Sequence, residues 1–390
     1  MKRSLIITIG IVIILLILGM WVYLFLYGAP KATTDVFTNL GVLPKGDKSV
    51  RIVDANTSTL KDSQLALGGS VLQQLTTRAV AGFGFASSSP DILRYVERGT
   101  GHVYEINLTS GKEEQVSVTT FPQATEAVFS PDTTSVALTS YEGYQKIVSV
   151  GTIDAHTTSV TLVKLPIGAE NIAFANETTL YFTHTEAGKT LGSMFNIHTQ
   201  AQTLLFTISL TDVEVLWGNG LKATYVLVKP SQTLEGALYV VSKNILTPVT
   251  NSEFGLTAFT NGAYTIASHA TNNTYISESL KNGTISEQGI LMLKEKCAID
   301  RTRDGVVWCA SPLEPAPKTY VEDWYKGIII SKDYLWLTDL SSKSSELKGD
   351  IPKLSGKTLD VTGMTINSNG KVLLFGNKID QTLWMYRTGR

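Results

Sequence analysis

The sequence carries little charge, and neither sign prevails. Only 17% of its 390 residues are charged, with 33 Lys and Arg against 34 Asp and Glu. Nucleic-acid binding needs a basic surface, so this balance predicts no nucleic-acid partner. The hydrophobic share of 43% excludes a wholly disordered chain, which combines low hydrophobicity with high charge. The chain can therefore bury a large core, and its length allows one large domain or two to three ordinary ones.

The sequence also lacks the short motifs of common chemistries. It contains no HExxH, no GxSxG elbow, no GxxxxGK[ST] loop and no D-x-D-x-D-G calcium loop. Its five histidines show no close metal spacing, and acid pairs such as Glu113-Glu114 are typical of solvated turns. We therefore predict no catalytic residue, no cofactor and no metal site.

Only two cysteines occur, Cys297 and Cys309. They lie in the first and second predicted strands of one repeat. A turn centred on Arg303 places them opposite each other, where they can form a cross-strand disulfide. A two-residue turn at Asp304-Gly305 places Cys309 opposite Asp300 instead. An extracytoplasmic position permits oxidation, but free cysteines are often small core residues, so both states remain open.

One long hydrophobic run stands at the N-terminus, from Leu5 to Tyr27. About 20 apolar residues in a helix span the hydrocarbon core of a bilayer. Lys2 and Arg3 precede the run, so the positive-inside rule keeps the N-terminus cytoplasmic. A cleaved signal peptide would have a shorter run and a small residue where Tyr27 stands. We expect cytoplasmic residues 1–4, a transmembrane signal anchor in contact with lipid over 5–27, a stalk over 28–48 and an extracytoplasmic domain over 49–390.

The remaining chain reads as short strands with a repeat, and long helical patterns are missing from it. An alternating apolar stretch centred on an aromatic or large aliphatic residue recurs seven times, with steps of 43, 48, 44, 37, 60 and 48 residues. The period matches a four-stranded propeller blade, which has about 40–50 residues. The central residues of these stretches are Tyr104, Ile147, Phe195, Tyr239, Ile276, Trp336 and Trp384.

A strand, polar turn and strand precede several of these stretches. Ala127 to Thr139 and Gly363 to Phe375 are examples, and the turns carry Asp, Asn or Gly because the hairpin between buried strands must be polar. The segment 128–132, Val-Phe-Ser-Pro-Asp, resembles the F-S-P-D turn of WD40-like and TolB-type β-propeller repeats. Residues 101–112 resemble the third strand and following turn of such repeats.

The resemblance extends through the repeat pattern over roughly residues 49–390, although the WD dipeptide is not repeated. It implies an all-β, seven-bladed β-propeller that acts as a binding platform, with six or eight blades as alternatives. The last unit offers three strands, 363–367, 371–376 and 382–387. We therefore predict that residues 49–53 or 64–67 pair beside 382–387 and close the ring.

The longest step contains an insertion that is rich in Pro and then in aromatic residues. Long loops in compact domains are often functional, and Tyr and Trp are favoured binding anchors. We predict that Tyr320, Trp324 and Tyr325 bind a partner, the alternative being that they fold back over the blade.

The sequence thus predicts a membrane-anchored, extracytoplasmic propeller that binds a protein, peptide or envelope polymer. One alternative is an extracytoplasmic hydrolase or lyase with its site at the propeller channel. Another is a subunit of an envelope assembly, recruited through the transmembrane helix.

Overall fold

A computed structural model describes residues 18, 70–154, 156–218, 224–260 and 263–389. The predicted anchor over 5–27 and the stalk over 28–48 lie outside the described residues, Leu18 excepted. No helix within the described ranges is long and apolar enough to cross a membrane. All described residues except Leu18 belong to one compact unit, Thr59–Arg390.

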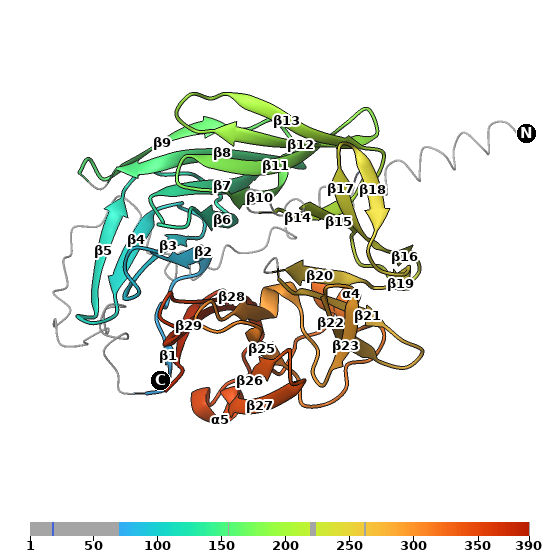
Figure 1. The fold of residues 1–390 in the computed structure, drawn as a ribbon. Helices are drawn as coiled ribbons and strands as arrows, with labels where there is room; N and C mark the ends of the chain where they lie inside the picture. The colour runs from blue at the N-terminus through green and yellow to red at the C-terminus, as the bar shows by residue number, and fades with distance from the viewer. Residues whose placement is uncertain (1–17, 19–69, 155, 219–223, 261–262, 390) are drawn as a thin grey trace, which may run out of the picture. The chain divides into compact units, whose positions relative to one another are not determined.

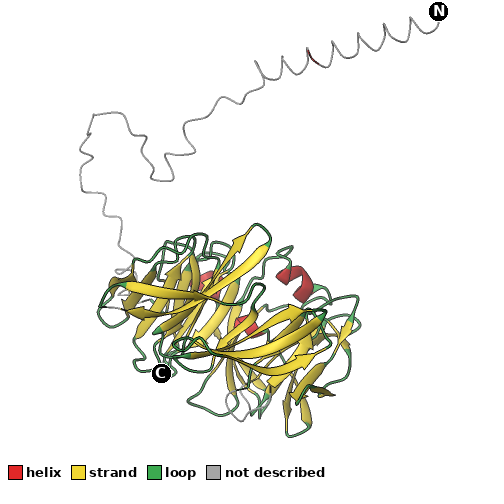
Figure 2. Ribbon diagram, turned by 90° about the horizontal axis from the view of Figure 1, so that it is seen from above, coloured by secondary structure: helices red, strands yellow, loops and turns green. Residues whose placement is uncertain are grey.

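This unit is a seven-bladed β-propeller. It contains seven four-stranded antiparallel sheets, and Figure 1 shows them around a common centre, with β2, β6, β10, β14, β20 and β28 nearest to it. Figure 2 shows how strongly strand predominates over helix. The predicted all-β fold is confirmed, and the blade number is seven rather than six or eight.

The blades follow one another along the chain. The strands of the first three are β2 (Val80–Phe85), β3 (Ile92–Glu97), β4 (Val103–Asn107) and β5 (Lys112–Ser117); β6 (Glu126–Phe129), β7 (Ser135–Glu142), β8 (Gln145–Asp154) and β9 (Ser159–Lys164); and β10 (Glu170–Phe174), β11 (Thr179–Glu186), β12 (Lys189–Asn196) and β13 (Gln202–Ile208). Those of the fourth and fifth are β14 (Val213–Leu216), β15 (Thr224–Val228), β17 (Leu238–Ser242) and β18 (Ile245–Pro248); and β20 (Thr257–Thr260), β21 (Thr265–Ala270), β22 (Tyr275–Lys281) and β23 (Thr284–Gln288). The sixth has β24 (Cys297–Ile299), β25 (Val306–Ser311), β26 (Tyr334–Asp339) and β27 (Ser344–Gly349), and the seventh has β28 (Val361–Ile366), β29 (Val372–Asn377), β30 (Leu383–Arg387) and β1 (Leu72–Gln74).

Short elements occupy the connections between these strands. They are the two-stranded sheet of β16 (Glu235–Gly236) and β19 (Glu253–Phe254), the 3-10 helix η1 (Lys294–Lys296) and the helices α4 (Tyr320–Tyr325) and α5 (Ile351–Ser355). Because α4 lies between β25 and β26, it accounts for the 60-residue step in the repeat.

All seven repeat residues fall on the third strand of their blades, which confirms the period. The Ser-Pro-Asp turn shows why polar residues recur between the first two strands. Asp132 Oδ1 accepts hydrogen bonds from Ser130 Oγ at 2.9 Å and from the Thr134 amide at 3.0 Å. The Ser135 amide donates to Ser130 Oγ at 2.9 Å. These side chains satisfy the backbone groups that the reversing chain leaves unpaired.

The hydrophobic core consists of clusters between neighbouring blades rather than one central mass. Val96 and Val103 of the first blade pack with Val136 and Leu138 of the second, for example. Similar clusters fill the other interfaces, including the one between the seventh and first blades. Each blade is therefore covered by its two neighbours, and the ring leaves no blade face without a partner.

The ring closes through the N-terminal side of the chain, as predicted, but with a different strand. β1 pairs with β30 in the register Leu72↔Tyr386, Gln73↔Met385 and Gln74↔Trp384. Both sides of β30 are taken, by β1 and by β29, so the predicted pairing beside it of residues 49–53 or 64–67, which lie outside the described residues, is wrong. Deleting residues 70–76, which include β1, should therefore open the ring and lower its melting temperature.

Two faces of the ring differ in the segments that form them. We call the loop face the one that carries the blade-to-blade connections and the loops between second and third strands. The turn face carries the turns between first and second and between third and fourth strands. β30 begins at the loop face, so antiparallel β1 begins at the turn face, where the chain enters the ring.

Candidate functional site

The three aromatic residues of the insertion lie on α4, at the loop face, but they do not share an exposed surface. Tyr320 and Trp324 are buried, and only Tyr325 is exposed, at 39%. The Tyr320 hydroxyl hydrogen-bonds to Ser331 Oγ, and burial raises the Tyr320 pKa to about 12. Tyr320 and Trp324 therefore cannot contact a partner at the surface, because both fold back over the blade, which is the alternative that the sequence left open.

A buried ion cluster explains why these aromatics turn inward. Lys296 Nζ lies 2.6 Å from Asp333 Oδ2 and 2.7 Å from Asp360 Oδ1, and all three side chains are buried. Trp324 Nε1 donates to Asp360 Oδ1 at 2.8 Å, and the Val361 amide donates to Asp333 Oδ2 at 2.7 Å. Burial opposes the charge on Lys296, but the two carboxylates outweigh it and raise the lysine pKa.

The cluster joins the sixth and seventh blades at the loop face. Lys296 ends η1 directly before β24, Asp360 directly precedes β28, and Asp333 directly precedes β26. Buried charges are retained in proteins when they are paired and hydrogen-bonded, as here. We interpret this cluster as structural support for the loop face.

A second charged group, the rim group, lies beside the first and consists of Glu214, Lys294, Glu295 and Tyr325. Lys294 Nζ is 2.5 Å from Glu214 Oε1 of β14, so it links the sixth blade to the fourth along the inner rim. The Tyr325 hydroxyl donates to Glu295 Oε2 at 2.8 Å. Burial raises the pKa of Glu295, an effect that Lys294 opposes and Glu214 reinforces. The lysine nevertheless keeps 42% of its side chain exposed, so solvent reaches the group.

Lys378 completes this side of the loop face. Its Nζ lies 4.0 Å from the centre of the Trp324 ring and donates to the Trp324 carbonyl. Burial lowers the pKa of Lys378; Asp360 opposes the shift, and the nearby charge of Lys296 adds to it.

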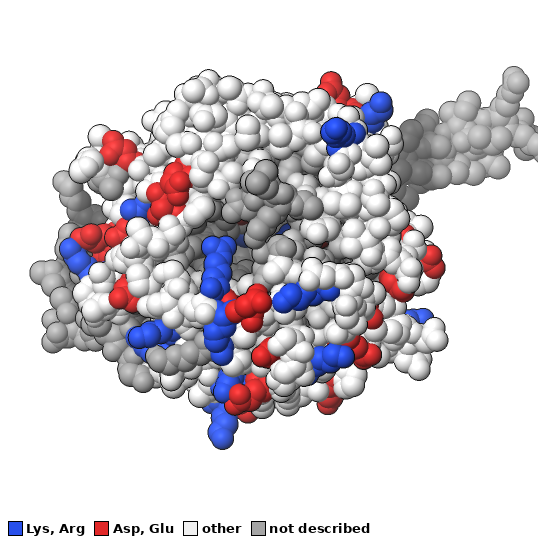
Figure 3. All heavy atoms as spheres, viewed as in Figure 1, with Lys and Arg blue, Asp and Glu red and all other residues white. Residues whose placement is uncertain are grey.

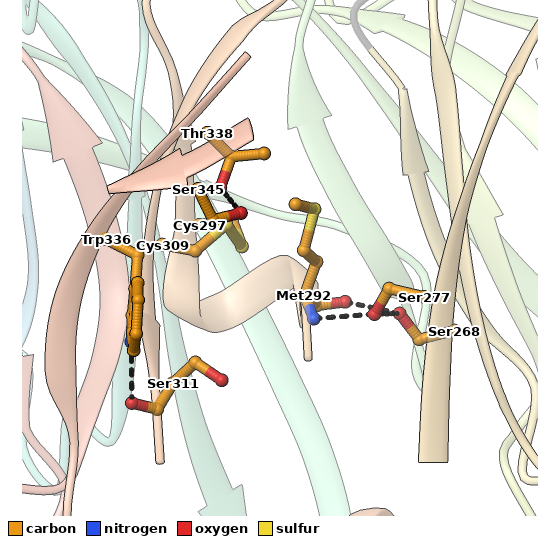
Figure 4. Close-up of a disulfide and its surroundings, with 9 residues drawn as sticks. All are labelled: Ser268, Ser277, Met292, Cys297, Cys309, Ser311, Trp336, Thr338 and Ser345. Atoms are coloured by element: carbon orange, nitrogen blue, oxygen red, sulfur yellow. Dashed lines mark hydrogen bonds between the residues drawn. A yellow bond between two sulfur atoms is a disulfide. The ribbon is translucent and has the colours of Figure 1, made fainter. Parts of the chain in front are cut away.

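The two cysteines lie on neighbouring strands and are joined. Cys297 on β24 pairs directly with Cys309 on β25, with their Cα atoms 4.1 Å apart and a disulfide between them (Figure 4). This is the register of a turn centred on Arg303. Both residues are buried against Phe259, Ile266 and other residues at the interface with the fifth blade.

A polar pocket opens on the loop face between the third and fourth blades. Its volume is about 240 Å³. It is lined by Gly168, Glu170, Asn171, Thr183, His184, Thr185, Thr190, Asp212 and Val213. Asn171 ties the two blades together beneath it, since its Nδ2 donates to Thr183 Oγ1 at 2.8 Å and to the Val213 carbonyl at 3.1 Å.

Exposed apolar side chains mark the loop face as well. Those in its connections and loops are Val118, Tyr144, Ile167, Leu234, Val249, Phe254, Leu313, Tyr325, Ile328, Ile330, Leu354 and Ile379. At the turn face fewer large apolar side chains are exposed: Ile245 directly follows the turn between β17 and β18, and Val71 stands where the chain enters. Exposed apolar residues scattered singly need no explanation, but their uneven distribution distinguishes the two faces of the ring.

Charged side chains of both signs are mixed on the face that Figure 3 draws. The part of this face over β12 and β13 is nearly uncharged. In the described part of the chain, no group of three or more His, Cys, Asp or Glu side chains is arranged to hold a metal ion. His269 lies between two carboxylates, with Glu253 Oε2 3.5 Å from its Nδ1 and Glu278 Oε2 3.6 Å from its Nε2.

Sequence reasoning missed both charged groups and the pocket. Lys296 stands 37 positions from Asp333 and 64 from Asp360, and only the juxtaposition of two blades brings them together. One signal was present in the sequence. Asp333 and Asp360 each stand directly before an apolar strand, which places both carboxylates where those strands begin, at the loop face.

Comparisons with known proteins show the fold alone. No family model matches the chain, and no curated protein matches it. An oligogalacturonate lyase in complex with manganese is similar at 10% identity and a TM-score of 0.57, over 83% of this chain and 94% of that one. The Cps50 (Swd1) β-propeller domain of Myceliophteria thermophila gives 8% identity, a TM-score of 0.53 and coverages of 81% and 99%. The β-propeller domain of the Trilobed protease from Pyrococcus furiosus is described as having an open velcro topology. It is similar at 10% identity and a TM-score of 0.51, over 79% of this chain and 96% of that one.

Proposed function

We propose that this chain is a membrane-anchored, extracytoplasmic propeller that binds a protein or peptide partner with its loop face. The bias of exposed apolar side chains toward that face carries the proposal. Ile328 and Ile330, at 67% and 62% exposure, lie in the segment that follows α4 and place two exposed apolar side chains close together on this face. Burying them against a partner would remove apolar area from water and so favour association.

The site beneath these side chains is suited to hold them in place. The ion cluster fixes α4 through Trp324, and Gln232 of the fourth blade fixes it from the other side. The Gln232 amide donates to Glu322 Oε2 at 2.5 Å, and its Nε2 donates to the Thr319 carbonyl at 3.2 Å. A preorganised surface loses less conformational entropy on binding, which favours affinity.

The membrane anchor and the compartment remain predictions from the sequence, as does the resemblance to WD40-like and TolB-type repeats. The apolar run over 5–27 and Lys2-Arg3 support the anchor. The disulfide supports an oxidising compartment, because such bonds persist mainly outside the cytosol. Protease treatment of intact cells tests the topology: an extracytoplasmic ring is cleaved, whereas a cytoplasmic one is protected until lysis.

The binding role is tested by photo-crosslinking of the full-length protein in its native membrane. A crosslinker at position 326, whose side chain is 57% exposed, should give a discrete product, and the double substitution Ile328→Ser/Ile330→Ser in the same protein should abolish capture of that partner. Leu204→Ser/Leu205→Ser is the matched control, because it removes two exposed leucines from β13, away from the loop face. Equal capture by both double variants contradicts the proposal.

One observation favours an enzyme instead. Glu295 has a raised pKa and accepts a hydrogen bond from Tyr325 at a solvent-accessible rim, and acids of this kind are used for proton transfer. A hydrolase or lyase acting through Glu295 would lose its activity toward glycans or peptides in Glu295→Gln, a change that keeps the acceptor for Tyr325. Turnover that persists in Glu295→Gln rules this candidate out.

A further inference from the structure

The pocket between the third and fourth blades differs chemically from the rest of the loop face, because its side chains offer hydrogen-bond acceptors. Two of them are carboxylates, Glu170 at the start of β10 and Asp212 directly before β14. No described residue donates a hydrogen bond to the Asp212 carboxylate. The two acids come from different blades.

Two hydroxyl groups of the pocket, those of Thr183 and Thr190, also act as acceptors. Thr190 Oγ1 donates its hydrogen to the Leu210 carbonyl at 2.6 Å. Thr183 Oγ1 donates its hydrogen to the Glu170 carbonyl at 3.4 Å and accepts a hydrogen bond from Asn171 Nδ2. A hydroxyl has one hydrogen and two lone pairs, so an oxygen whose hydrogen is engaged can only accept from a ligand.

The Asn171 side chain, one potential donor of the pocket, is fully engaged. Asn171 spends both amide hydrogens on Thr183 and on the Val213 carbonyl, and its Oδ1 accepts from the Val215 amide at 3.1 Å. The His184 ring stacks on Phe182 with centroids 5.9 Å apart, and its Nδ1 is buried without a hydrogen-bond partner among the described residues. A ligand that supplies several hydrogens therefore matches this lining better than one that accepts them.

The charge of the pocket narrows the choice of ligand further. Lys229 Nζ lies 3.4 Å from Glu170 Oε2, and both side chains are largely exposed, so this pair is weak and can open. With Lys229 counted, the two carboxylates leave one negative charge. Within the described residues, these acids belong to no group of three or more His, Cys, Asp or Glu side chains that could hold a metal ion. An ammonium group reaches oxygens at about 2.7–3.2 Å and brings three donors.

We infer that this pocket binds a primary ammonium group, namely the lysine side chain of a peptide partner. The inference rests on the proposed binding role of the loop face and names the chemistry recognised there. The volume of about 240 Å³ is below the roughly 300–1,000 Å³ of sites for drug-sized ligands, so it suits one side chain. Ile167 lies exposed beside the pocket and offers a contact for the apolar stem of such a lysine.

The test uses the full-length protein in detergent and two probes, Nα-acetyl-lysine N-methylamide and its Nε-acetylated counterpart, followed by calorimetry. We expect saturable binding of the first probe and at least tenfold weaker binding of the second, which lacks the charge. Asp212→Asn should weaken binding of the first probe about tenfold; Asn tolerates the left-handed φ of 51° at this position, so the backbone is preserved.

Two further variants make the result specific. Lys229→Met should strengthen binding, because it removes the internal competitor for Glu170. Glu186→Gln is the control: it removes a neighbouring carboxylate that does not line the pocket, so affinity should not change. Equal binding of the two probes, or an unchanged affinity in Asp212→Asn, overturns the inference. If the lysine probe does not bind but partner capture still depends on Ile328 and Ile330, the inference about the pocket fails and the proposed function stands. If the lysine probe binds as expected but partner capture does not depend on Ile328 and Ile330, only the proposed function is refuted.

Discussion

Reduction of the Cys297–Cys309 disulfide should destabilise the ring by an amount that the chain separation sets. The bond closes a loop with a sequence separation of 12. Cross-linking a loop of this length lowers the entropy of the unfolded chain by an amount that corresponds to about 3 kcal/mol at 25 °C. The two residues already face each other across β24 and β25, so the folded strands need little change when the bond breaks.

The assay is urea unfolding of the oxidised and the reduced protein, followed by tryptophan fluorescence. Trp308 is a suitable probe because it is buried on β25, one residue from Cys309. The free energy of unfolding should fall by about 3 kcal/mol on reduction. The double variant Cys297→Ala/Cys309→Ala is the control, since reductant should leave its midpoint unchanged.

Two results would refute this reasoning. A loss below about 1 kcal/mol on reduction would show that the unfolded chain is already constrained around this turn. An equal response of the Ala variant to reductant would show that the effect does not come from this bond.

Two other predictions concern the ion cluster. Lys296→Met leaves two buried carboxylates without their cation and should lower the free energy of unfolding, measured in urea, by about 3–5 kcal/mol. Lys294→Met removes a lysine whose side chain is 42% exposed and should lower it by about 1 kcal/mol or less. Equal losses would contradict the structural role of the cluster. Burial raises the Tyr320 pKa to about 12, so the folded state favours the protonated phenol, and stability should fall as pH rises from about 10 toward 12. Tyr320→Phe should flatten that slope in unfolding curves at pH 9 and pH 11, and an unchanged slope would refute the assignment.

The repeat made the fold predictable, because the third strand of each blade carries a large side chain in an alternating apolar stretch. The closing strand was placed too early in the chain. Leu72–Gln74 has three residues and no apolar alternation, so residues 49–53 matched a strand pattern better. Short strands that depend on a partner leave little local signal.

The site was harder to predict for a different reason. Tyr320 and Trp324 have the composition of a binding surface, and only their distance to Lys296 and Asp360 reveals that they are buried. The pocket depends on Glu170 and Asp212, which come from adjacent blades 42 positions apart. Sequence indicates that two blades are neighbours, but not which ends of their strands approach each other.

The joint between β1 and β30 also has a mechanical meaning. The chain enters at the turn face and runs along β1 toward the loop face, so tension directed away from the turn face acts along the strand. The hydrogen bonds between β1 and β30 are then loaded in shear, so they resist the force together rather than one after another. The Leu75 amide, 2.7 Å from the Leu383 carbonyl, and the Leu383 amide, 3.0 Å from Thr76 Oγ1, extend this joint beyond the strand. A three-residue strand can thus tether the whole ring while its loop face points away from the pull.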